Sequence, residues 1–232
     1  MALYDRDYAN ESLQTSEAGA KTALSSFIKK TYQLFAASLL AGSVGAYVGL
    51  GAAYIFTTNW FYIGGIIVWF ALSFGLYAAK KVNGLNYVLL FAFTFLGGFL
   101  LTPFLGGFLQ TPAGAAIVIN AFVLTTVAFG ALSIFAMNTK KSFSAWGKFL
   151  FIALIVLVAA IIINIFIPSP ILYTVISAAG AILFSIYIIY DTQNIIKGAY
   201  ETPIEGAIAL YLDFLNLFIF ILRLLGIFGS DE

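Results

Sequence analysis

Two aspartates, Asp191 and Asp213, lie deep inside the last two long apolar stretches of this sequence. Each is 11 residues from Thr202, which belongs to the short polar turn between those stretches. Equal distances along an antiparallel helical hairpin imply similar depth, roughly 10 Å inside the helix ends at 1.5 Å of rise per residue. We therefore expect the two carboxyl groups to face each other.

Two carboxylates at hydrogen-bonding distance in a dry interior cannot both ionise cheaply, so we expect the pair to share one proton and to titrate as a unit. At low pH the shared proton would hold the two helices together. Its loss would leave two anions that repel each other or attract a cation. Ca²⁺ suits such oxygen ligands, and two acids alone would bind it weakly, as a conduction pathway requires. The pair therefore indicates a pH sensor or gate with a weak Ca²⁺ site.

Polar side chains accompany the aspartates along one face of each predicted helix. One stripe, at i, i+4 and i+7 spacing, comprises Tyr187, Asp191 and Asn194. The other, within an arc of roughly 80° at 100° per residue, comprises Asp213, Asn216, Phe220 and Arg223. We expect the two stripes to meet and to line or support an ion pathway. Arg223 is about 15 Å from Asp213 along the helix axis, too far for an ion pair, and is expected at the opposite end.

The absence of histidine and cysteine narrows the possible chemistry. It excludes disulfides, thiol nucleophiles and Cys/His metal centres, and it leaves proton-linked behaviour near neutral pH to carboxylates. An alternative for the aspartates is a purely structural role, in which each stays protonated and hydrogen-bonds between helices. Ionisable residues are costly inside a membrane and are usually functional, which favours the sensor.

The composition determines what kind of chain must position these groups. Of 232 residues, 62% are hydrophobic and 9% are charged, which excludes a water-soluble domain and a nucleic-acid partner. Seven apolar stretches are long enough for membrane-spanning helices. They cover about 32–56, 60–79, 85–109, 113–137, 149–167, 171–196 and 204–228. We predict an all-α integral membrane protein with a polar tail at 1–31 and one seven-helix transmembrane domain at 32–232.

The basic residues predict the orientation of the chain in the membrane. Counting along the predicted spans, ten of the eleven lysines and arginines fall on one side, in the N-terminal tail and in the loops at Lys80, Lys140 and Lys197. By the positive-inside rule, this side faces the cytosol. The eleventh, Arg223, lies within the last span and leaves the exit of that helix open. Small residues in the first span, including Gly45 and Gly49, predict close helix packing.

Two segments of the sequence resemble a known family. FSIYIIYDTQ at 184–193 and LYLDFLNLFIFILRLLG at 210–226 resemble the Bax inhibitor-1 family, also called the transmembrane Bax inhibitor motif family, and the chain is similar in length to its bacterial members. The resemblance implies that the C-terminal helix packs centrally among the other six. It also implies a pH-sensitive calcium leak, with Asp191 and Asp213 as sensor and latch, in a bacterial inner membrane. Ca²⁺ and protons would be cargo, and no resident cofactor is expected.

The same resemblance implies a basic latch partner. Bacterial relatives can carry an arginine near the cytosolic end of the second helix, close to the aspartate pair. Here that region is AAKK, so Lys80 or Lys81 is the possible latch base. A lysine supplies charge but not the bidentate fork of an arginine.

Other functions remain open from the sequence. The main alternative is a membrane interaction protein that modulates proteases or stress-response partners through its helices or its tail. Proton-coupled transport of an organic solute is a third possibility. An aspartyl intramembrane protease is not expected, because Asp213 lies in YLDF and lacks the glycine-flanked, unwound backbone that would admit a peptide. We therefore predict no enzymatic activity.

Overall fold

The computed structural model describes residues 4–57 and 59–229, and in these ranges the chain is helical without strands. The elements are α1 (Tyr4–Gly51), η1 (Ala53–Thr57), α2 (Asn59–Ala79), α3 (Leu85–Leu100), α4 (Thr102–Phe108), α5 (Pro112–Asn138), η2 (Ser144–Trp146), α6 (Gly147–Phe166), α7 (Pro170–Ile196) and α8 (Pro203–Phe228). Residues 1–3 of the predicted tail and 230–232 of the predicted transmembrane domain lie outside the described residues.

Seven helical segments are long and apolar enough to cross a membrane, as predicted. They are Ala18–Gly51, Trp60–Ala79, Leu85–Phe108, Pro112–Asn138, Ser144–Phe166, Pro170–Ile196 and Pro203–Ile227. Large apolar side chains on the outside of the bundle are well exposed, for example Trp60 and Phe166 at 80% each. Apolar surface on this scale requires a lipid environment, which identifies an integral membrane protein.

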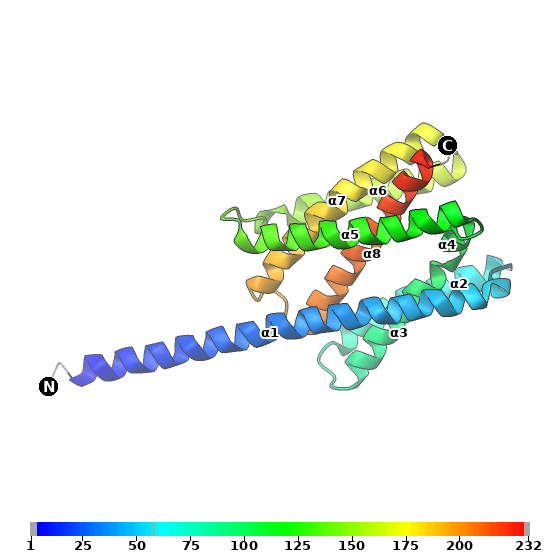
Figure 1. Cartoon of the computed structure of the whole chain (residues 1–232). Helices are drawn as coiled ribbons and strands as arrows, with labels where there is room; N and C mark the ends of the chain where they lie inside the picture. Colours follow the sequence, from blue (N-terminus) through cyan, green and yellow to red (C-terminus); the bar gives the residue numbers. More distant parts are fainter. Residues whose placement is uncertain (1–3, 58, 230–232) are drawn as a thin grey trace.

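The helices differ from the stretches predicted from the sequence in two places, the first stretch and the third. The first is continuous from Tyr4, so the tail prolongs α1 as a helix and extends past the other helices (Figure 1). The third stretch contains two helices, α3 and α4, which meet at Leu101. Pro103 lies in the first turn of α4, where its missing N–H costs no helical hydrogen bond.

The C-terminal helix α8 is central in the bundle, as the family resemblance implied. It packs mainly against α7, α1 and α5, with a smaller contact to α3, while α2 packs mainly on α3 and α6 on α7 (Figure 1). Side chains along α8, including Leu210, Leu217 and Leu222, are fully or almost fully buried. The sequence left the exit of this helix open. Its 26 residues extend about 39 Å, so α8 crosses the bundle.

The two ends of the bundle differ in charge. The end that carries Lys80, Lys140 and Lys197, in the α2–α3, α5–α6 and α7–α8 connections, is called the basic end below. The α1–α2, α4–α5 and α6–α7 connections lie at the other end, called the opposite end, which α8 reaches at its C-terminus.

The α7–α8 turn at the basic end has strong local signals. Gly198 follows α7 with a φ of 66°, a left-handed conformation that glycine adopts without strain. Thr202 then caps α8, and its hydroxyl and the Glu205 carboxylate form a reciprocal capping box around Pro203 at the first turn. These signals fix where α7 ends and α8 begins. They therefore fix the register between Asp191 and Asp213.

Glycines allow α1 and α3 to approach closely. A methyl group at Gly98 of α3 would overlap the backbone of Gly42 in α1, and one at Gly45 would overlap the backbone of Phe95. The predicted small-residue seam in α1 is therefore in backbone contact with α3, through Gly45 and the neighbouring Gly42.

Replacing Gly98 by alanine should destabilise the protein by about 1–3 kcal/mol, because the added methyl group forces two helix backbones apart. The midpoint of thermal unfolding in detergent measures this effect. Gly130→Ala in α5 is the matched control, since no atom lies within 4 Å of its added methyl group. Equal midpoints for the two variants would contradict the importance of this contact.

Candidate di-aspartyl site

Asp191 of α7 and Asp213 of α8 are both buried, with 6% and 4% of their surfaces exposed. Their carboxyl groups lie within hydrogen-bonding reach of each other. The structure thus brings together the two residues that their equal distances from Thr202 predicted to meet. Burial of both acids among apolar helices creates the dry setting in which two carboxylates cannot ionise independently.

Tyr200, which the sequence reasoning missed, is the strongest hydrogen-bond partner of the pair. Its hydroxyl donates to Oδ1 of Asp191 at 2.7 Å, and the amide of Asn194 reaches the same oxygen at a longer 3.5 Å. Burial and the neighbouring Asp191 raise the pKa of Tyr200, so this hydroxyl remains a donor at neutral pH. A tyrosine in the turn, nine residues after Asp191, gives no periodicity signal. It is placed by the fold of the turn.

Asp213, unlike Asp191, has a carboxylate oxygen without a hydrogen-bond donor among the described residues. This oxygen, Oδ2, is buried. An ionised carboxylate oxygen without a donor in an apolar interior is costly. One proton between the two carboxyl groups would supply the missing hydrogen bond. The arrangement can therefore hold a proton, and it would lose a contact between α7 and α8 when that proton leaves.

The other predicted polar residues contribute unequally. Tyr187 is half-buried and close enough to both aspartates to interact with them electrostatically. Asn194 contacts Asp191, as described above. The amide of Asn216 instead donates to the backbone carbonyl of Leu212, one turn back in α8, at 2.7 Å.

Arg223 lies near the opposite end, as predicted, and has no acidic partner among the described residues. Its guanidinium carbon is 5.4 Å from the ring centre of Tyr173, 5.6 Å from that of Phe220 and 5.7 Å from that of Phe104. Its Nε is buried and has no hydrogen-bond partner within residues 4–57 and 59–229.

The lysines predicted as a latch base contact glutamates instead of the aspartates. The Nζ of Lys80 is 2.7 Å from Oε1 of Glu205 and 3.4 Å from Oε2 of Glu201, and Lys81 is 2.7 Å from Glu201. These ion pairs connect the end of α2 to the start of α8. The capping box places Glu205 there, because its other oxygen accepts from the backbone N–H groups of Glu201 and Thr202. The sequence carried this signal in the Thr-Pro-Ile-Glu segment on the same side as AAKK.

Gln193, next to the aspartate site, anchors the α5–α6 connection. Its amide oxygen accepts from the backbone N–H of Phe143 at 2.8 Å, and its amide nitrogen donates to the carbonyl of Lys141 at 2.8 Å. The sequence placed Gln193 within a motif but assigned it no role. These two hydrogen bonds attach the basic end of α7 to the connection between α5 and α6.

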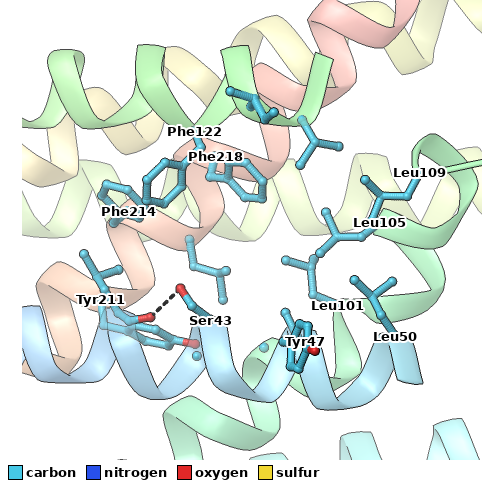
Figure 2. Close-up of a pocket in the computed structure, with 17 residues that line it drawn as sticks. Ser43, Tyr47, Leu50, Leu101, Leu105, Leu109, Phe122, Tyr211, Phe214 and Phe218 are labelled. Carbon is cyan, nitrogen blue, oxygen red and sulfur yellow. Dashed lines mark hydrogen bonds between the residues drawn. The ribbon is translucent and has the colours of Figure 1, made fainter. Parts of the chain in front are cut away.

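An apolar cavity of about 390 Å³ lies between α1, α4, α5 and α8 (Figure 2). Tyr211, Phe214 and Phe218 of α8 form one wall, and neither aspartate lines it. The hydroxyl of Tyr211 is satisfied by the carbonyl of Thr94, and that of Ser43 by the carbonyl of Leu39. The cavity therefore lies on the opposite face of α8 from the polar stripe, and no charged side chain lines it.

No group of three or more histidine, cysteine or acidic side chains that could hold a metal ion occurs within the described ranges. The oxygen atoms that could contact a cation at this site come from Asp191, Asp213 and Asn194, with Tyr200 and backbone carbonyls nearby. Ca²⁺ is accordingly considered below as cargo.

Comparisons with known proteins place this chain in a family. The sequence profile of the family described as "Inhibitor of apoptosis-promoting Bax1" matches residues 24–230. An uncharacterised protein of Campylobacter jejuni is 56% identical over 99% of this chain and 100% of its own length. Bax inhibitor 1 of Schizosaccharomyces pombe is 33% identical over 92% of this chain and 80% of its own. The inner membrane protein YbhL of Escherichia coli is 30% identical over 96% and 98%. The chain therefore belongs to the Bax inhibitor-1 family.

Proposed function

We propose that this protein is a pH-sensitive leak pathway for Ca²⁺ across a bacterial inner membrane, with its basic end in the cytosol. The observation that carries this proposal is the contact between two buried carboxyl groups on adjacent helices, Asp191 on α7 and Asp213 on α8. Membrane helices rarely contain acids, and a buried pair near one end of the central helix is suited to control whether that helix stays packed.

Proton loss turns the attraction between the two carboxyl groups, and so between α7 and α8 at this point, into repulsion. With one proton the carboxyl groups attract each other through a hydrogen bond. Without it, two negative charges about 4 Å apart repel by roughly 4 kcal/mol at an effective dielectric constant of about 20. This is comparable to the loss of a large buried side chain. Rising pH would therefore separate the helices or draw Ca²⁺ between the carboxylates.

The described conformation corresponds to the closed state of this pathway. The aspartates are buried, and the apolar cavity lies on the other face of α8. Two acids and an amide provide fewer than the six to eight oxygen ligands that Ca²⁺ prefers. A passing ion would therefore be held weakly, as a leak requires.

The pKa shifts of Lys80 and Glu201 both move the titration of these two side chains further from neutral pH. The hydrogen bond to Glu205 raises the pKa of Lys80 above its ordinary 10.5, so its contribution is present below that value and lost only at higher pH. The hydrogen bond from Lys81 lowers the pKa of Glu201 below its ordinary 4.5, so its contribution is lost only in stronger acid. Sensing near neutral pH is therefore assigned to the aspartates, whose titratable neighbours are Tyr187 and Tyr200.

In this proposal the Lys80–Glu205 ion pair is a latch. It connects the cytosolic end of α2 to the first turn of α8, and Tyr200 in the adjacent turn holds Asp191. The lysine thus serves the latch role that the family resemblance implied, but through a glutamate.

Replacing both aspartates by asparagine should abolish the pH dependence of Ca²⁺ flux into proteoliposomes between about pH 6 and pH 8, because no proton is left to exchange at the site. Ca²⁺ uptake reported by an enclosed dye measures this. Asn164→Ala is the control, because Asn164 lies near the end of α6 and its side chain accepts from the backbone N–H of Ser169 instead of contacting the aspartates. If the double variant retained normal flux and pH response, the proposal would be wrong.

Replacing Tyr200 by phenylalanine should shift the midpoint of the flux–pH curve about one unit toward alkaline pH. The lost hydroxyl stabilises the ionised form of Asp191, so a higher pH is needed to remove the shared proton. The same flux assay measures the shift, with Tyr190→Phe as control. An unchanged or acid-shifted midpoint would contradict the assigned hydrogen bond.

Replacing Lys80 by glutamine should raise Ca²⁺ flux a few-fold at acid pH while leaving the midpoint of the pH response in place. The latch is lost while the aspartate pair is untouched. Lys81→Gln is the matched control, since the Lys81 side chain is 69% exposed and exposed ion pairs contribute little. Equal effects of the two substitutions would exclude a specific latch at Lys80.

The extension of α1 beyond the bundle favours a second candidate function (Figure 1). A helix reaching past the membrane spans offers a surface for a protease or a stress-response partner. Crosslinking in native membranes with residues 2–17 deleted would test it. Loss of crosslinked partners with normal Ca²⁺ flux would support an interaction role carried by this segment.

A further inference from the structure

Arg223 is a charged side chain in a membrane-spanning helix, and it has no acidic partner among the residues that the structure describes. The ion pairs of the described residues are all at the basic end, between Lys80 or Lys81 and the glutamates of the α7–α8 region. Arg223 is ten residues from Asp213, about 15 Å toward the opposite end. Charges inside membranes are normally paired, so an arginine without an acid partner indicates that its positive charge itself is used.

Three aromatic rings hold this charge in place. Phe104 of α4, Tyr173 of α7 and Phe220 of α8 each lie 5.4–5.7 Å from the guanidinium. The negative faces of aromatic rings stabilise a cation partly removed from water, and they do so without cancelling its net charge. The buried Nε has no hydrogen-bond partner among the described residues. The three rings therefore position a full positive charge that no acidic side chain of the described residues cancels.

Arg223 lies on the same face of α8 as Asp213, further along the contact between α7 and α8. Arg223, Phe220 and Asp213 share one face of α8, and this face is turned toward α7. Phe220 packs against Phe184 of α7, with ring centres 5.9 Å apart, and against Gly180. A route that opens from the aspartates along the α7–α8 contact therefore passes Phe220 and ends beside Arg223.

We propose that Arg223 is an electrostatic barrier to cations at the opposite end of this pathway. The inference rests on the proposed leak function and assigns its selectivity. A fixed positive charge raises the energy of a passing cation in proportion to the charge of that ion, so the barrier for Ca²⁺ is twice that for K⁺. The aspartates control when the pathway opens, and Arg223 limits how fast divalent ions pass once it is open.

The test compares Ca²⁺ and K⁺ flux in proteoliposomes at alkaline pH for Arg223→Gln, Arg223→Met and Arg223→Lys. Both neutral variants should raise K⁺ flux about threefold and Ca²⁺ flux about tenfold, the square of the factor for K⁺, because the exponent doubles with ion charge. Methionine packs well against aromatic rings and provides a second neutral variant if glutamine disturbs folding. Arg223→Lys keeps the charge and should stay within about twofold of the unmodified protein.

Three results would overturn the barrier. One is unchanged Ca²⁺ flux in the neutral variants while the unmodified protein leaks in a pH-dependent way, which leaves the leak function standing. Another is an equal increase for K⁺ and Ca²⁺, or an increase in Arg223→Lys as well, because both indicate loosened packing instead of lost charge. The third is an absence of Ca²⁺ flux in every protein at every pH, which overturns the leak function together with the barrier.

Discussion

The contact between two carboxyl groups across the α7–α8 hairpin is the interaction on which the rest of this structure depends. Asp191 and Asp213 are buried in a bundle that exposes many large apolar side chains. Their mutual contact is favourable only while a proton is held between them. The helix that carries Asp213 is central and packs directly on four other helices.

Three other groups contribute to the proposed gating through separate physical effects. The hydroxyl of Tyr200 donates to Asp191, and the Lys80–Glu205 ion pair connects α2 to α8. Arg223 carries a charge near the opposite end that no acidic side chain of the described ranges neutralises. Each effect has a different dependence on pH, ionic strength and the charge of the ion. The close α1–α3 contact brings two helix backbones together, and both of these helices pack on α8.

The sequence predicted the fold and the aspartate pair correctly because both depend on simple regularities. Span length follows from bilayer thickness, and the meeting of Asp191 and Asp213 follows from equal distances to one turn. Tyr200 and the Lys80–Glu205 pair were missed because they depend on the three-dimensional path of a turn and on side chains far apart in sequence. The break between α3 and α4 at Leu101 was missed because the apolar stretch continues through it, although Pro103 marked the place.

Infrared spectroscopy of the reconstituted protein tests the central claim most directly, because a protonated carboxyl group has its own C=O stretching band. We expect a band at acid pH that disappears as the pH rises through neutrality and that is absent when Asp191 and Asp213 are both replaced by asparagine. A band that persists unchanged into alkaline solution would show that the aspartates are only structural. A spectrum without any such band at acid pH would show that they share no proton.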